Sequence, residues 1–147
     1  MTPPAGTSRG RVWLGVGGGG LAWAAHLAAL YVLAEFGCTG GLGERVVGGV
    51  SLVAWLVLAA TVAGLVAVGA AVRVSWSTAV AARERLAREA APEGEAGLEG
   101  DASPGAANEL FAGRVGVIGG ALFALSIAFQ ALPVLFHLRA CGGAVPS

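Results

Sequence analysis

Three apolar stretches, at about residues 12–36, 46–72 and 111–138, constrain the fold of this chain more than any other feature of its sequence. Each is longer than the ~20 residues that an α-helix needs to cross a hydrocarbon core of ~30 Å. The chain is 56% hydrophobic and 12% charged, with a mean hydropathy of +0.75, so it is far more apolar than a typical soluble domain. These features predict an all-α membrane protein, a bundle of three transmembrane helices that forms a single domain over 1–147.

The nine arginines are the only strongly basic residues, and their distribution predicts the orientation of the helices. Seven lie before the first stretch, after the second or at the start of the third, whereas Arg45 and Arg139 lie on the opposite side. The seven are Arg9, Arg11, Arg73, Arg83, Arg85, Arg88 and Arg114. Because arginine is enriched on the cytoplasmic side of membrane helices, we expect a cytoplasmic N-terminus and a periplasmic or extracytoplasmic C-terminus. The chain would be a multi-pass protein of the bacterial cytoplasmic (inner) membrane, and its zero net charge gives no reason to expect a nucleic-acid partner.

A cleaved signal peptide is the alternative interpretation of the first stretch. Arg9 and Arg11 would form its basic region. However, the apolar segment is longer than the central region of a signal peptide, and it contains His26 and Glu35. A membrane-spanning helix is therefore the preferred interpretation.

The segment between the second and third stretches has two parts. Helical periodicity continues beyond the membrane to about residue 90, with Glu84 and Arg88 at the i,i+4 spacing that supports a helix. Residues 91–107 are rich in Pro, Gly, Ala and acidic residues, which predicts a flexible acidic linker. Asn108 is then placed to cap the third helix.

Two cysteines, Cys38 and Cys141, follow the outer ends of the first and third stretches. The expected topology exports both thiols to the same side, into an oxidising compartment where exposed cysteines normally form disulfides. We therefore expect a Cys38–Cys141 disulfide that makes the first and third helices neighbours. The alternative is two unrelated buried cysteines, which behave as small apolar residues.

Glycines gather at the opposite ends of the same two helices, and Gly116 and Gly120 form a GxxxG pair. Small residues at this spacing allow the backbones of membrane helices to approach closely. We expect these glycines to bring the first and third helices close together. They are Gly15 and Gly17–Gly20 in the first helix, Gly19 included, and Gly113, Gly116, Gly119 and Gly120 in the third. A general bias of the composition toward Gly and Ala is the alternative.

Polar residues inside apolar helices are costly, so they are the candidates for function. They are His26, Tyr31 and Glu35 in the first helix and Ser126, Gln130 and His137 in the third. Counting back from the cysteines at ~1.5 Å per residue places both His26 and Gln130 about 16–18 Å deep, which predicts a hydrogen bond between them. Glu35 could relay protons, but a carboxylate that reaches the membrane surface is the simpler interpretation.

The chain offers no catalytic constellation, so we do not expect an enzyme. With one methionine and no cluster of Cys and His, no metal site is expected either. His137 lies about 12 Å closer to the surface than His26, so the two histidines could not ligate one haem. His26 as a single haem ligand stays open, although a packed, hydrogen-bonded histidine is the simpler interpretation.

The motifs Trp23-Ala-Ala-His26 and Gln130-Ala-Leu-Pro133, together with Tyr31 and the two terminal cysteines, resemble a group of small three-helix bacterial membrane proteins. These are typically encoded beside cytochrome c oxidase genes. The resemblance implies a non-catalytic accessory subunit or assembly partner of a respiratory membrane complex, with the lipid bilayer and a larger protein complex as its partners. The resemblance supplies no catalytic role, and the residues themselves give no reason to expect a cofactor. The alternative is a small haem-handling or transport protein that uses His26, Gln130 and Glu35 directly.

Overall fold

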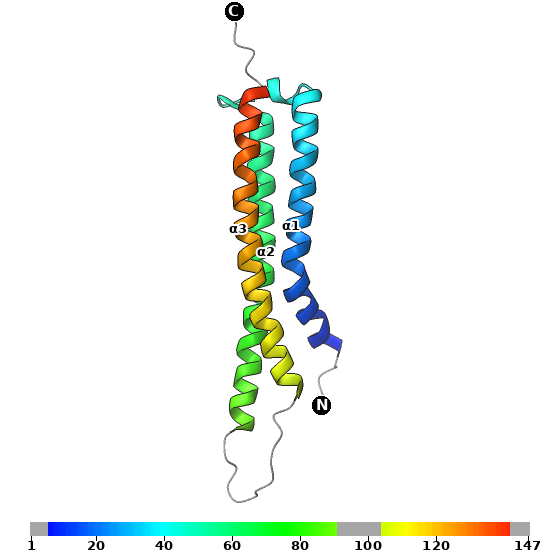
Figure 1. The fold of residues 1–147 in the computed structure, drawn as a ribbon, viewed down its shortest axis with the longest axis vertical. Helices are drawn as coiled ribbons and strands as arrows, with labels where there is room; N and C mark the ends of the chain where they lie inside the picture. The colour runs from blue at the N-terminus through cyan, green and yellow to red at the C-terminus, as the bar shows by residue number, and fades with distance from the viewer. Residues whose placement is uncertain (1–5, 91–103, 142–147) are drawn as a thin grey trace, which may run out of the picture.

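Three long helices packed along their lengths make up the fold (Figure 1). The computed structural model describes residues 6–90 and 104–141, with side chains described for 10–37, 39–90 and 104–133. The helices are α1 (Gly6–Thr39), α2 (Leu52–Glu89) and α3 (Pro104–Cys141). All three contain segments long and apolar enough to cross a membrane, so the expected all-α, three-helix architecture is confirmed.

The first and third helices run in the same direction and α2 runs against them (Figure 1). The last residues of α1 and α3 therefore lie at the same end of the bundle as the first residues of α2. We call this the hairpin end. The opposite end, where α2 finishes with Arg83, Arg85 and Arg88, is the arginine end.

A small hairpin, not a simple loop, connects α1 to α2. After the short helix η1 (Leu42–Glu44), strands β1 (Val46–Val47) and β2 (Val50–Ser51) pair antiparallel, with Val47 opposite Val50. Gly48 and Gly49 turn the chain with φ of 61° and 81°, left-handed values that glycine adopts without strain. The second helix consequently begins at Leu52, later than the expected start at residue 46.

Local hydrogen bonds fix this beginning of α2. The Ser51 hydroxyl accepts from the backbone N–H of Ala54 at 3.3 Å, which satisfies one of the unpaired donors of the first turn. The indole N–H of Trp55 donates to the carbonyl of Val47 at 3.2 Å. The hairpin is thereby attached to the helix that follows it.

At the arginine end, α3 begins earlier in the chain than the sequence predicts. This helix begins at Pro104, inside the segment expected to be a linker, because proline fits the first position of a helix, where its missing N–H costs nothing. Asn108 therefore lies within the helix and is not its cap. Residues 91–103, the rest of the expected linker, lie outside the described residues. The expected extension of α2 to about residue 90 is present, and Arg85 pairs with Glu109 of α3 at 3.3 Å.

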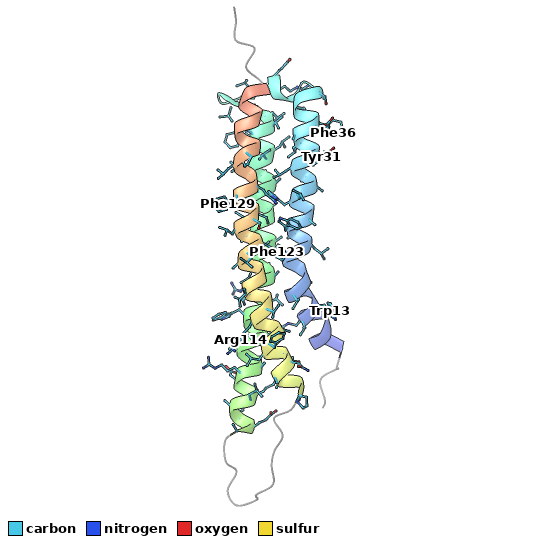
Figure 2. The ribbon with its side chains drawn as sticks, in the orientation of Figure 1. Trp13, Tyr31, Phe36, Arg114, Phe123 and Phe129 are labelled. Atoms are coloured by element: carbon cyan, nitrogen blue, oxygen red, sulfur yellow. The ribbon has the colours of Figure 1, made fainter. Side chains whose placement is uncertain are left out.

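The interior of the bundle is narrow and follows one face of α2. Its buried residues recur at steps of three, four or seven positions and face the other two helices. They are Val53, Val57, Thr61, Gly64, Val68, Ala71, Ser75 and Ala82. Most large apolar side chains instead point outward; Leu21 is 74% exposed and Phe129 is 63% exposed (Figure 2). The bundle thus has a thin core, to which α2 contributes mainly Val, Ala, Gly, Ser and Thr, and an apolar outer surface.

Candidate functional site

Four polar side chains have buried polar atoms in the middle of the bundle, and we call them the polar centre: Trp23, His26, Thr61 and Gln130. His26 is 3% exposed, and its Nε2 lies 3.2 Å from the Oγ1 of Thr61 on α2. A Cβ on Gly64 would contact His26 and Ile127 at 3.4 Å, so this glycine lets α2 approach both neighbouring helices beside the imidazole.

The second hydrogen bond of Thr61 defines the direction of the first. Its hydroxyl lies 2.8 Å from the carbonyl of Val57, one turn earlier in the same helix, and must donate its proton there. Thr61 therefore accepts from His26, which places the imidazole proton on Nε2 and leaves Nδ1 as an acceptor. The histidine thus joins α1 to α2 in one specific tautomer.

The hydrogen bond expected between His26 and Gln130 is absent, and this expectation was wrong. The Nδ1 of His26 and the Oε1 of Gln130 are both buried with no hydrogen-bond partner in the described part of the chain. Both atoms are acceptors, so they cannot bond to one another.

The relative register of α1 and α3 is a second reason why His26 and Gln130 do not form a hydrogen bond. Gly116 approaches Gly15, and Gly120 approaches Gly19. The same register places Ile127, not Gln130, level with His26. Gln130 lies three residues nearer the hairpin end, about 4.5 Å along the helix. The depths expected from the sequence were counted back from Cys38 and Cys141, and they did not include this shift.

Trp23 completes the polar centre on the side nearer the arginine end. Its ring packs against Phe123 of α3 with centroids 5.9 Å apart and planes tilted by 35°, a favourable aromatic arrangement (Figure 2 labels Phe123). Its buried indole N–H has no partner among the described side chains. The polar centre therefore holds one donor and two acceptors that the bundle itself does not use.

The three helices also approach one another closely at a second position, between the polar centre and the arginine end. The Oγ of Ser75 on α2 donates to its own helix at Ala71, at 3.0 Å, and lies between Gly15 and Gly116. A Cβ on Gly15 would lie 2.5 Å from this oxygen. A Cβ on Gly116 would overlap the same oxygen and lie 3.1 Å from the carbonyl oxygen of Gly15. Glycine at 15 and 116 is required by this packing.

One turn further toward the polar centre, Gly19 and Gly120 allow a similar approach. A Cβ on Gly120 would overlap Val72 of α2, and one on Gly19 would lie 3.2 Å from the ring of Phe123. Four of the glycines singled out in the sequence therefore lie where helices approach closely.

The remaining polar candidates are not brought to the polar centre. Tyr31 is 72% exposed and Glu35 is exposed on the outer side of α1, about 13 Å along the helix from His26 (Figure 2 labels Tyr31). The Ser126 hydroxyl donates to the Leu122 carbonyl of its own helix at 2.9 Å. The side chains of Cys38, His137 and Cys141 lie outside the described residues.

Two hydroxyl groups that form hydrogen bonds in the interior were not singled out by the sequence analysis. Thr61 and Ser75 lie in α2, which contains the most apolar of the three candidate spans, and the sequence of this helix suggested no specific site. Their signal was available, because Thr61, Gly64, Ala71 and Ser75 recur at helical spacing as the small or polar members of one face.

The geometry of the polar centre supports a role in holding the helices together more directly than a role in catalysis or cofactor binding. Within the described ranges, no group of three or more His, Cys, Asp or Glu side chains could hold a metal ion. The Nε2 of His26 is already bonded to Thr61, so a haem iron would have to use Nδ1 or break that bond. Comparison of the chain with protein-family models, with curated proteins and with solved structures finds no match.

Proposed function

We propose that this chain is an integral membrane protein whose three helices cross the bilayer. The spacing of exposed tryptophans on α2 supports this placement. Trp55 is 47% exposed and Trp76 is 63% exposed, and they are about 31 Å apart along the helix. Tryptophan favours the two membrane–water interfaces, which are ~30 Å apart.

The first helix repeats the pattern. Trp13 is 71% exposed near the arginine end and Phe36 is 57% exposed near the hairpin end, about 34 Å away (Figure 2). Between these levels the outer surface is formed mainly by Leu, Val, Ile and Phe side chains, which water would solvate poorly and acyl chains would solvate well; Tyr31, Glu35 and Arg73 are exposed toward its two edges. In our proposal the arginine end faces the cytoplasm of a bacterium and the hairpin end faces the periplasmic side.

Within that membrane we propose a non-catalytic role, as an accessory subunit or assembly partner of a respiratory complex of the cytochrome c oxidase type. The hydrogen bond between His26 and Thr61 supports a non-catalytic role. His26 is the titratable side chain of the polar centre, and this bond uses it to join two helices. The broad apolar faces that remain are suited to lipid and to the helices of a larger partner. The choice of partner rests on the resemblance of the Trp23–His26 and Gln130–Pro133 motifs.

A small haem-handling or transport protein is the second candidate. The unused acceptors on His26 and Gln130 favour it, since a bound group could satisfy them. The outward position of Glu35 counts against it, because the three residues that this role requires are not gathered at one place.

Purification of the tagged full-length chain in a mild detergent separates the two candidates. The accessory role predicts oxidase subunits in stoichiometric amounts, no absorption band from the chain itself, and less assembled oxidase in a deletion strain. An unchanged oxidase level in the deletion strain would contradict it. A Soret band that His26→Ala abolishes and the outward control Tyr31→Phe retains would support haem handling instead.

A further inference from the structure

A groove at the arginine end lies between α2 and α3 and has a volume of about 250 Å³. Trp76, Val80 and Arg83 line it from α2, and Arg114, Val117 and Ile118 line it from α3. It therefore combines an apolar floor with two guanidinium groups from different helices. Figure 2 labels Arg114 toward the arginine end of the bundle.

The two arginines of this groove carry positive charge that the described carboxylates do not neutralise. Glu109 pairs with Arg85 and Glu84 pairs with Arg88. Arg83 and Arg114 have no ion pair with any carboxylate that the structure describes. An anion is the complement that this site lacks.

The level of the groove agrees with the phosphate layer of a bilayer. Contacts of Gly113 with Ala79 and of Gly116 with Ser75 set the register of α2 and α3. In this register Arg114 lies about 3 Å beyond Trp76, and Arg83 lies about 10 Å beyond it, toward the arginine end. A headgroup layer extends ~5–7 Å beyond the hydrocarbon edge, so the two arginines lie on either side of the phosphate level.

The apolar residues lie in the direction that an acyl chain would take. By the same register, Val117 and Ile118 lie nearer the membrane centre than Arg114, and Ile118 is 64% exposed. On α2, Val80 lies at a level between Arg114 and Arg83 and forms an apolar wall beside the two guanidinium groups. A molecule with a phosphate at one end and an alkyl chain at the other would match both parts of the groove.

We propose that this groove binds an anionic phospholipid, with its phosphate beside Val80, between Arg83 and Arg114, and an acyl chain along Val117 and Ile118. The inference rests on the proposed membrane placement. An anionic headgroup such as phosphatidylglycerol is preferred to phosphatidylcholine, because choline would bring a cation beside two unneutralised arginines. A basic groove between helices on the cytoplasmic side is suited to this recognition.

Native mass spectrometry of the full chain in mild detergent, titrated with phosphatidylglycerol or phosphatidylcholine, measures the affinity. The groove variant R83Q/R114Q is compared with R73Q/R88Q, which removes the same charge from α2 outside the groove. We expect the groove variant to bind phosphatidylglycerol about tenfold or more weakly, because each arginine near a headgroup contributes ~1 kcal/mol. We expect the control to stay within about twofold of the wild type, because its arginines do not touch the groove.

A second variant, Val80→Trp, retains both arginines and fills the groove at the level between them. It should also lose phosphatidylglycerol, whereas free inorganic phosphate at millimolar concentration should not displace the lipid from the wild type. Displacement by phosphate would show that the site takes the free anion. Equal loss in R73Q/R88Q, or equal binding of both lipids, would overturn the proposal and leave the arginines to an acidic partner protein.

Insertion is measured separately, by alkaline carbonate extraction and by flotation with phosphatidylcholine vesicles. A wild-type chain released by carbonate would contradict the membrane placement itself. A chain that resists extraction but does not prefer phosphatidylglycerol would contradict the lipid site alone.

Discussion

The imidazole of His26 donates to the hydroxyl of Thr61 across the interface between α1 and α2, at 3.2 Å and out of contact with the surroundings of the bundle. The Thr61 hydroxyl in turn donates a hydrogen bond to the carbonyl of Val57, so the two hydrogen bonds form a short directed chain from one helix into the next. Such a chain defines both the pairing of the helices and the rotation of α2 about its axis.

Thr61→Val should weaken the bundle, because valine retains the shape of threonine but cannot accept from the His26 imidazole. Buried hydrogen bonds between membrane helices contribute ~0.6 kcal/mol on average and at most about 1.7. We expect a loss of about 0.5–1.5 kcal/mol in the free energy of unfolding, measured by titration with a denaturing detergent and followed by circular dichroism.

Thr78→Val is the matched control, because the Thr78 hydroxyl donates to Val74 of its own helix at 2.9 Å. It should change the unfolding free energy by less than about 0.5 kcal/mol. If the loss caused by Thr61→Val were as large in a His26→Leu background, the two side chains would not be coupled and the assignment would be wrong.

Gly116→Ala should destabilise the packing of α3, because its Cβ would overlap the Ser75 hydroxyl. Overpacking of this kind costs ~1–3 kcal/mol. Gly119→Ala, on the same helix, has nothing within 4 Å of the added methyl group and should leave stability unchanged or slightly raised. Unfolding in detergent compares the two variants.

Ser75→Gly provides the complementary test of that contact. Removal of the hydroxymethyl group makes room for the methyl group at 116, so the loss caused by Gly116→Ala should shrink in the Ser75→Gly background. A loss of unchanged size would mean that the clash lies elsewhere.

The sequence was sufficient for the helices and for the close-packing glycines, because long apolar runs and GxxxG spacing depend on local pattern. It was insufficient for the partner of His26, which depends on the register between helices that are distant in sequence. Gln130 was chosen by counting from Cys38 and Cys141, yet the packing of Gly116 against Gly15 shifts the register by a few residues. The hairpin before Leu52 was missed because Val46 and Val47 fit an apolar helix as well as a strand.

Tryptophan fluorescence should report the proposed depth of the bundle. In single-tryptophan variants with the other three changed to Phe, Trp55 and Trp76 should be quenched most by lipids brominated near the headgroup. Trp23 lies between the two interfaces and should respond most to lipids brominated deep in the chain. Deepest quenching of Trp76 would contradict the membrane level that we assign to the arginine end.

A disulfide between Cys38 and Cys141 stays a prediction, and the observed helix register makes it more specific. The last residues of α1 and α3 lie at the same end of the bundle (Figure 1). The register from the Gly15–Gly116 and Gly19–Gly120 contacts places the two cysteines about 3 Å apart along the axis. A disulfide allows a Cα–Cα distance of up to ~6.8 Å, so the helix axes would have to converge at the hairpin end.

Non-reducing electrophoresis with thiol alkylation tests this directly. The wild-type chain should take up no alkylating reagent until it is reduced, and Cys38→Ser should expose one reactive thiol at Cys141. The same Cys38→Ser variant should also unfold more easily, because a bridge that closes a loop of roughly one hundred residues contributes up to ~4–5 kcal/mol in the chain-entropy model. Two thiols that are alkylated without reduction would rule out the bridge, and α1 and α3 would then be held together by their glycines and by α2 alone.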